Sequence, residues 1–162
     1  MSDPGKVVPA IRTAVAADLP ALREVYRAAS LSNAGDAPLL LARPEFLVFA
    51  GDGVADGRTL VAVLDGKVVG FATVAPGEDD GPELEDLFVD PDQRRRGIAR
   101  LLVERLAGTA RETGHRRMWV TGNSHALAFY HAAGFVEVAR TRTALGTGLR
   151  MSLDLRPPEQ PR

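Results

Sequence analysis

The stretch from Leu84 to Val103 constrains the fold more than any other part of this chain. Its apolar residues Leu84, Leu87, Phe88 and Val89 form a short run that is typical of a buried strand. The strand ends at Asp90-Pro91, because proline has no N–H to give to a sheet ladder. From about Gly97 onward the apolar residues recur at helical spacing. The pattern predicts a strand, a tight turn, a loop and a helix, in that order.

The loop before this helix is rich in positive charge. Three arginines, residues 94–96, are followed directly by Gly97. The first N–H groups of a helix have no internal partner and lie at the positive end of its dipole, so they attract anions. Gly97 lets the backbone approach a ligand closely because it has no Cβ. These features predict a phosphate or pyrophosphate site.

Two motifs together resemble the GNAT N-acetyltransferase superfamily. Arg94-x-x-Gly97-x-Ala99 is similar to the acyl-CoA pyrophosphate loop of that superfamily. Residues 123–135 are similar to its second signature, Asn-x-x-Ala-x-x-Phe-Tyr-x-x-x-Gly-Phe. Two motifs in the right order are much more specific than either one, and the resemblance covers nearly the whole chain.

Turn and periodicity signals predict one α/β domain over residues 10–155, between a flexible tail (1–9) and a proline-rich tail (156–162). Asp65-Gly66 between two apolar runs marks a hairpin, and residues 51–57 are expected to form a flexible loop. The expected order is β-α-α-β-β-β-α-β-α-β-β. The resemblance implies a GNAT-like central mixed, mostly antiparallel sheet with helices on both faces. Helices are expected after an N-cap at Asp18, over residues 38–41 and 44–49, from Gly97 to about Thr113, and over 124–133.

Composition argues against several classes of function. The chain of 162 residues has no cysteine, which removes disulfides, thiolate metal sites and a cysteine nucleophile. Its formal net charge of −1 favours neither nucleic acid nor a membrane surface, and no apolar run approaches the roughly 20 residues that span a bilayer. No His, Asp or Glu set has metal spacing, and the N-terminus lacks the apolar core of a signal peptide. We expect a cytoplasmic protein without a metal, and a nucleic-acid-binding basic loop is the least favoured interpretation.

The resemblance implies acetyl-CoA as the acyl-donor cosubstrate of an N-acetyltransferase. The backbone of Leu87, Phe88 and Val89 would then meet the thioester and pantetheine, although Phe88 and Val89 also suit an ordinary strand core. The diphosphate would be held by Arg94, Arg95, Arg96, Gly97, Ile98 and Ala99. Asn123 would hydrogen-bond the pantetheine arm, and its alternative role is a helix N-cap.

Tyr130 is the expected general acid, because the resemblance implies that its hydroxyl lies near the sulfur of coenzyme A. Phenol and thiol reference pKa values differ by only about 1.5 units, so a phenol can donate to a departing thiolate. The alternative is a core tyrosine with a satisfied hydroxyl. Glu85 is the expected general base, and Glu83 is the other carboxylate considered; Asp86 points to the opposite face of the strand from Glu85.

The resemblance implies an amine acceptor, and a direct attack in a ternary complex is expected because no cysteine can carry the acyl group. A small molecule or a peptide remains open, and the acidic run at residues 78–80 would suit a cationic amine. The leucine-rich region after residue 37 is either core or a wall of the acceptor pocket. A homodimer is one expected state, since dimers are common in the superfamily. The alternative function is a non-catalytic acyl-CoA-binding or regulatory module on the same fold.

Overall fold

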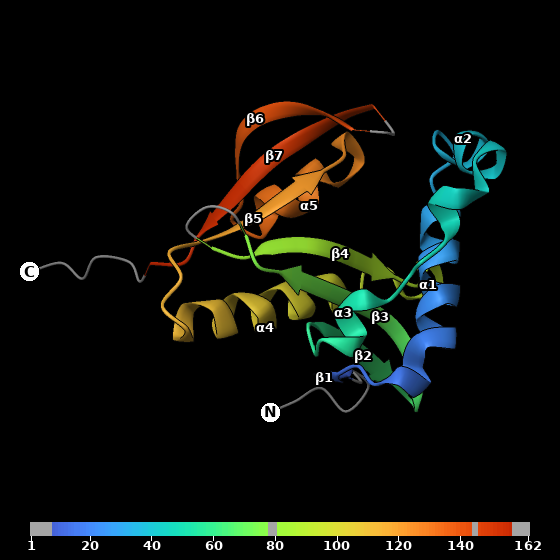
Figure 1. Ribbon diagram of the computed structural model, residues 1–162, viewed down its shortest axis with the longest axis horizontal. Helices are drawn as coiled ribbons and strands as arrows, with labels where there is room; N and C mark the ends of the chain where they lie inside the picture. The colour runs from blue at the N-terminus through green and yellow to red at the C-terminus, as the bar shows by residue number, and fades with distance from the viewer. Residues whose placement is uncertain (1–7, 78–80, 144–145, 157–162) are drawn as a thin grey trace, which may run out of the picture. The chain divides into compact units, whose positions relative to one another are not determined.

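The computed structural model describes residues 8–77, 81–143 and 146–156 (Figure 1). The described residues form strands and α-helices in this order: β1 (Ala10–Thr13), α1 (Leu19–Leu31), α2 (Ala37–Ala42), α3 (Asp52–Ala55), β2 (Thr59–Leu64), β3 (Lys67–Ala75), β4 (Glu83–Val89), α4 (Ile98–Glu112), β5 (Arg117–Gly122), α5 (Leu127–Ala132), β6 (Val136–Thr143) and β7 (Gly146–Asp154). Short 3-10 helices precede or link them: η1 (Ala16–Asp18), η2 (Pro44–Leu47), η3 (Pro91–Gln93) and η4 (Ser124–Ala126).

The strands form one sheet in the order β1-β2-β3-β4-β5-β7-β6. β1 with β2, β2 with β3, β5 with β7 and β6 with β7 pair antiparallel, whereas β4 and β5 pair parallel. The expected α/β class with a mixed, mostly antiparallel sheet is therefore confirmed. The chain divides into two compact units. Unit 1 contains the described residues up to Thr73 together with Asp86–Leu102, and unit 2 contains those of Val74–Glu85 and Val103 onward.

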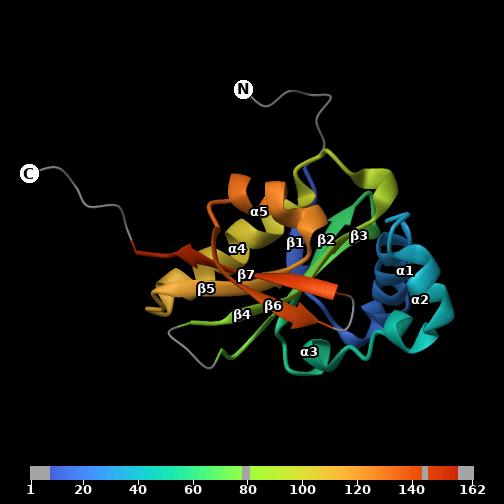
Figure 2. The ribbon, with the colours of Figure 1, turned by 90° about the horizontal axis from the view of Figure 1, so that it is seen from above.

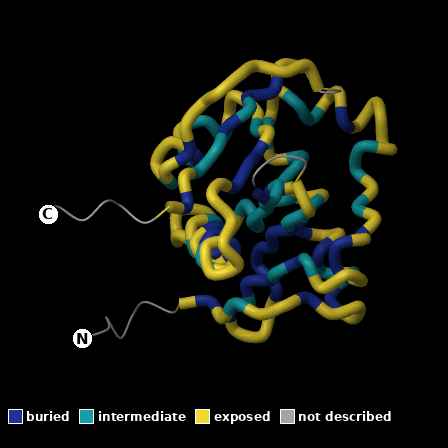
Figure 3. Tube along the Cα trace, turned by 60° about the vertical axis from the view of Figure 1, so that its left-hand side comes forward, coloured by how far each residue is buried: buried dark blue, intermediate teal, exposed yellow. Residues whose placement is uncertain are grey.

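In unit 1, helices cover both faces of β3. The strands β2 and β3 are buried over most of their length (Figure 3). Phe71 belongs to a core cluster with Leu22 and Val25 of α1. Its neighbour Gly70 faces the other side of the strand, where an added Cβ would lie 3.1 Å from Cγ2 of Ile98, the first residue of α4. The start of α4 is thereby fixed against the sheet.

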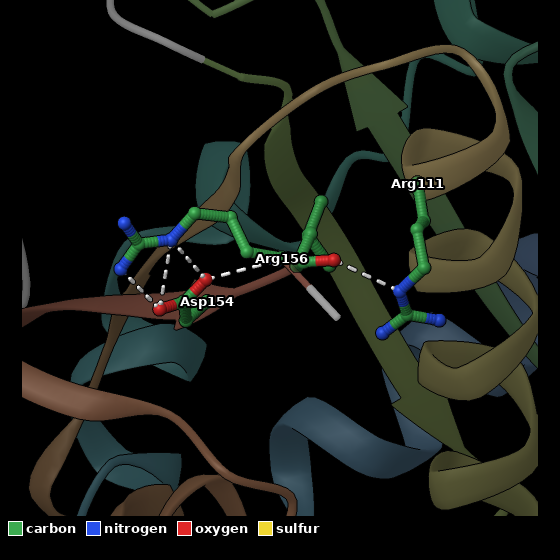
Figure 4. A network of polar contacts seen from close by, with 4 residues as sticks. Arg111, Asp154 and Arg156 are labelled. Atoms are coloured by element: carbon green, nitrogen blue, oxygen red, sulfur yellow. Dashed lines mark hydrogen bonds and ion pairs between the residues drawn. The ribbon is translucent and has the colours of Figure 1, made fainter. Parts of the chain in front are cut away.

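In unit 2, β5, β7 and β6 run side by side (Figure 2). Met118 and Val120 of β5 are buried together with Met151 of β7. Tyr130 of α5 lies on this face, because an added Cβ on Gly122 would be 3.0 Å from both its ring and Met151. All residues of β6 are exposed. The end of β7 is tied to α4, since Nε of Arg111 donates to the backbone carbonyl of Leu155 at 2.9 Å (Figure 4).

The expectation of a flexible loop over residues 51–57 was wrong, because this segment contains the short helix α3. Gly51 precedes the helix with a φ of +80°, and Val54 is buried. Gly53 packs so closely on the strands that an added Cβ would lie 2.5 Å from Cγ2 of Thr73 and 2.9 Å from Oγ1 of Thr59. Packing on the sheet orders a segment whose composition indicates a loop.

Asp18 occupies the N-cap position of α1, but its side chain makes no cap hydrogen bond to the helix. Its carboxylate instead accepts hydrogen bonds from the Arg12 guanidinium at 2.8 and 2.9 Å and from the Val15 N–H at 2.8 Å. The hydrogen bond with Arg12 is the main reason that the pKa of Asp18 lies below its ordinary value. The residue therefore joins β1 to the turn before α1.

The remaining differences concern element ends. Residues 124–133, expected as one helix, form η4 and then α5, and the final hairpin begins and ends a few residues from the expected positions. Residues 1–7 and 157–162 of the expected tails, the acidic run at 78–80 and part of the final hairpin turn lie outside the described residues.

Candidate functional site

The loop between β4 and α4, in unit 1, alternates in the sign of its backbone φ angle. Arg94 has a φ of −66°, Arg95 of +66° and Gly97 of +74°, while Arg96 between them is on the negative side. Alternation of this kind turns successive N–H groups toward one point, the nest geometry that binds anions. A left-handed conformation costs a non-glycine residue such as Arg95 about 1 kcal/mol. The loop thus holds strain in an anion-binding conformation.

Gly97 is required for its conformation rather than for space. An added Cβ would meet no atom within 4 Å, but its positive φ is one that a side chain disfavours. Helix α4 follows at once, with the N–H of Leu101 donating to the carbonyl of Gly97 at 3.0 Å. The positive end of a helix of 15 residues therefore adjoins the loop.

The base of the loop packs against Val69 and Gly70 of β3, two residues that were not predicted from the sequence as part of the site. An added Cβ on Gly70 would lie 3.1 Å from the carbonyl oxygen of Phe88, so a side chain here would need the two strands to shift by a few tenths of an ångström. The N–H of Asp90 donates to the carbonyl of Val69 at 2.8 Å, and the carboxylate of Asp90 accepts from the N–H of Asp92 at 3.0 Å. The signal in the sequence was a lone glycine inside a strand, which often marks close approach of another backbone.

The three arginines of the loop have different surroundings. Nη2 of Arg94 donates to Oγ of Ser32, at the end of α1. Within the described residues, no side-chain partner is found for Arg95 or Arg96, and both are exposed. The Oε1 atom of Gln93, just before the loop, is buried without a hydrogen-bond partner in the described part of the chain. An unpaired buried acceptor costs free energy unless a water molecule or a ligand donates to it.

Leu87, Phe88 and Val89 are half-buried at the end of β4. The ring of Phe88 packs edge-on against Tyr26, with centroids 4.9 Å apart, and against Phe71 at 5.6 Å. The side chain of Phe88 therefore belongs to the core of unit 1, as its alternative interpretation expects. A role for its backbone is compatible with this packing.

In unit 2, the parallel ladder of β4 with β5 is short. It joins Glu83 to Trp119 and Leu84 to Val120, although β4 has 7 residues. Glu83 is also ion-paired, since Nη1 of Arg150 donates to its Oε1 at 2.5 Å. The Arg150 guanidinium lies 4.8 Å from the centroid of the Trp119 ring. The carboxylate of Glu83 is thus already engaged by the Arg150 guanidinium. Glu85 is exposed.

Tyr130 lies in an aromatic environment on α5. Its ring is 5.2 Å from that of Phe129 and 5.4 Å from that of Phe135, and the residue is only 7% exposed. Burial raises its pKa to about 12. No hydrogen-bond partner for its hydroxyl is found among the described residues. A core tyrosine usually has a satisfied hydroxyl, so Tyr130 retains an unused donor that is protonated at neutral pH.

Asn123 acts as the N-cap of η4. Its Oδ1 accepts a hydrogen bond from the N–H of Ala126 at 3.0 Å. Asn123 therefore has the capping role that was its alternative interpretation. The cap uses only Oδ1, so the NH2 group of the same side chain can still donate to a ligand. Capping fixes the orientation of that group.

The sequence-predicted residues thus fall into two groups. Leu87, Phe88, Val89 and the loop from Arg94 to Ala99 belong to unit 1, whereas Glu85, Asn123 and Tyr130 belong to unit 2. Over the described residues, no three His, Asp or Glu side chains are grouped so that they could hold a metal ion. In the same part of the chain, the helices are too short or too polar to span a bilayer.

Comparison with known proteins gives the same family by sequence profile and by similar proteins. The profile of the Acetyltransferase (GNAT) family matches residues 19–135. The mycothiol acetyltransferase of Gordonia bronchialis is 37% identical over 86 residues, which are 51% of this chain and 28% of that protein. The streptothricin acetyltransferase of Streptomyces lavendulae is 41% identical over 86 residues, 50% of this chain and 46% of that protein. The chain therefore spans less than half the length of either relative.

Solved structures share the fold over almost the full chain. A GCN5-related N-acetyltransferase from Rhodopseudomonas palustris has a TM-score of 0.75 and 22% identity, and the match covers 94% of this chain and 99% of that one. The PaiA N-acetyltransferase from Thermoplasma acidophilum, solved in complex with coenzyme A, has a TM-score of 0.70 and 17% identity, with 91% and 99% covered. At these identities the likeness concerns the fold alone.

Proposed function

The chain belongs to the GNAT acetyltransferase family, and on that premise we propose that it transfers an acetyl group from acetyl-CoA to an amine acceptor. Acetyl-CoA is a cosubstrate that carries a diphosphate and a thioester. A binding protein therefore needs an anion site and polar groups for the acyl end. The amine attacks the thioester carbonyl directly, the carbon–sulfur bond breaks, and coenzyme A leaves as a thiol after taking up a proton.

The observation that carries this proposal is the alternating backbone of Arg94 to Gly97 at the start of α4. Main-chain N–H groups in a nest, together with a helix N-terminus, suit a diphosphate. Arg95 and Arg96 add charge, and Ile98 and Ala99 supply the first helical N–H groups. We assign the backbone of Leu87, Phe88 and Val89 to the pantetheine and thioester, and the NH2 group of Asn123 to the pantetheine arm.

Tyr130 is proposed as the donor to the departing sulfur. Its hydroxyl has no partner among the described residues, and its pKa of about 12 keeps it protonated at neutral pH. That pKa exceeds the thiol reference value of about 8.5, so full proton transfer from the unliganded phenol is uphill. The hydroxyl therefore acts first as a hydrogen-bond donor that stabilises charge developing on sulfur.

Glu85 is proposed as the base that keeps the acceptor amine neutral. Glu83, whose carboxylate is paired with Arg150, is the other carboxylate considered. For the acceptor, mycothiol and streptothricin appear in the names of two relatives. An acceptor screen therefore begins with small-molecule amines related to these compounds and continues with peptides.

The second candidate function is acyl-CoA binding without catalysis. A binding module would use the same anion-binding loop as the enzyme, but it would not need Tyr130 as a donor to sulfur. The Tyr130 hydroxyl, which has no partner among the described residues, favours the enzyme, since a binding module has no leaving group that needs a donor.

Two measurements, made one after the other, test the proposal. Acetyl-CoA at 100 times its Kd should add about 2.7 kcal/mol to the free energy of unfolding, read as a raised Tm. Release of free thiol is then followed across an amine library. No shift in Tm at millimolar acetyl-CoA contradicts both functions, whereas a shift without thiol release for any amine selects the binding module.

A further inference from the structure

Arg94 differs from its two neighbours because its side chain is already bound within unit 1. Its Nη2 donates to Oγ of Ser32, which is 62 residues earlier in the chain. The Ser32 hydroxyl donates in turn to the carbonyl of Ala29 at 2.6 Å. A hydroxyl has one hydrogen to give, so its lone pairs are left to accept from Arg94. The contact is a chain of two hydrogen bonds with a defined direction.

The place where this contact forms is favourable for a cation. Ser32 is the C-cap residue of α1, and its backbone N–H also donates to the carbonyl of Ala29, at 3.3 Å. The last carbonyls of a helix lack internal partners and lie at the negative end of the dipole, which attracts a guanidinium. Arg94 is thus held by a hydroxyl that lies at the negative end of α1. Its guanidinium is engaged before any ligand arrives.

The residue that follows Arg94 is strained. Arg95 has a φ of +66°, and such a conformation persists only where the surroundings fix it. The contact of Arg94 with Ser32 fixes the segment 95–97 at one end, and helix α4 fixes it at the other. The conformations open to this segment are therefore restricted. Arg95 and Arg96 have no side-chain partner within the described residues, so their guanidinium groups remain available to an anion.

We propose that Ser32 is a positioning residue for the cofactor loop: it holds the guanidinium of Arg94, and Arg94 thereby fixes the anion-binding conformation instead of binding the diphosphate. The loop N–H groups, Arg95 and Arg96 then make the contacts with the ligand. This inference rests on the proposed function, because it assigns the loop to coenzyme A. It divides three adjacent arginines into one anchor and two ligand-binding residues.

A double-mutant cycle with coenzyme A as the probe tests this division. The dissociation constant is measured calorimetrically for wild type, Ser32→Ala, Arg94→Ala and the double variant. We expect each single change to weaken binding roughly fivefold, the effect of one hydrogen bond, and the double change to weaken it no further. Ser32→Thr, which keeps the hydroxyl, should restore wild-type affinity. Arg95→Ala combined with Ser32→Ala is the matched control, and its effects should multiply.

Two further readouts separate positioning from loss of charge. Arg95→Ala removes a ligand-binding charge, so it should reduce the salt dependence of binding, whereas Ser32→Ala should leave that dependence unchanged. In the free protein, Ser32→Ala should speed hydrogen exchange of the amides of residues 95–98 without lowering Tm by more than a few degrees. Unchanged exchange in the free protein overturns the inference whether or not coenzyme A binds.

The failures can be told apart. Wild-type protein that does not bind coenzyme A contradicts the proposed function and the inference with it. Wild-type binding with a normal Ser32→Ala variant and a weakened Arg94→Ala variant contradicts the inference alone, because Arg94 would then contact the ligand directly.

Discussion

The anion loop and Tyr130 prepare for a ligand in opposite ways. The loop from Arg94 to Gly97 is exposed, and its proposed binding groups are main-chain N–H groups supported by the guanidinium groups of Arg95 and Arg96. Tyr130 is 7% exposed, and its binding group is a side-chain hydroxyl in an aromatic environment. The loop depends on backbone conformation, whereas Tyr130 depends on burial, which raises its pKa to about 12.

This difference predicts which substitutions the loop and the surroundings of Tyr130 tolerate. Main-chain donors survive most side-chain changes, provided that the φ angles persist. A buried hydroxyl is lost with a single atom while its ring packing remains. The loop should therefore respond to changes of conformation and Tyr130 to changes of chemistry. Three predictions examine this contrast, and a fourth concerns a surface pair outside both regions.

The largest effect is expected for Tyr130→Phe. It should lower turnover about 100-fold, the lower range for loss of general acid catalysis, and leave the Kd for coenzyme A within about twofold. Steady-state kinetics and calorimetry measure the two quantities. Tyr26→Phe is the matched control, since the Tyr26 hydroxyl is already bonded to the carbonyl of Phe46 at 2.5 Å. Equal turnover in wild type and Tyr130→Phe removes Tyr130 from this role.

The second effect concerns alkaline stability. The pKa of Tyr130 rises from 10.0 to about 12 on folding, so the stabilisation from its neutral form is complete below pH 10 and is lost as the pH rises toward 12. At pH 11 the loss should be about 1.4 kcal/mol, one pKa unit. Urea unfolding at pH 8 and pH 11 should show this loss in wild type. The same loss in Tyr130→Phe would assign it to other groups.

The third effect belongs to the loop. Gly97→Ala should lower the free energy of unfolding by about 1 kcal/mol, because alanine disfavours a positive φ. It should weaken coenzyme A binding as well. Gly108→Ala within α4 is the matched control: an added Cβ meets no atom within 4 Å at either glycine, but only Gly97 has a positive φ. Gly108→Ala should stabilise the protein by up to about 1 kcal/mol. Equal effects at both positions would refute the conformational argument.

The smallest effect is expected outside both regions. Hydrogen bonds from Arg156 lower the pKa of Asp154 to about 2 (Figure 4). Its stabilising contribution is present above the ordinary pKa of 3.8 and is lost as the pH falls through 2. Because the pair is exposed to solvent, Asp154→Asn should leave Tm at pH 7 unchanged within error. A clear decrease at pH 7, measured by calorimetry, would show that this surface pair has a structural role.

Much of the fold could be predicted because its signals are local. The order of strands and major helices follows from apolar periodicity, from Asp65-Gly66 and from the Asp90-Pro91 stop. Helix α3 could not be predicted, since its glycines indicate a loop and only packing against Thr59 and Thr73 orders it. The same holds for Asp18, whose carboxylate binds Arg12 instead of the helix.

For the candidate site, the sequence alone predicted an anion-binding loop and the glycine within it, and the family resemblance pointed to the tyrosine of the second motif. These depend on neighbours within a few residues, where backbone sterics and helix periodicity act. Packing of distant segments set the contact of Arg94 with Ser32, the ion pair of Glu83 with Arg150 and the burial of Tyr130. Arg94 meets Ser32 across 62 residues and Arg150 meets Glu83 across 67. Contacts over such separations arise from packing of the whole chain, so no local pattern encodes them.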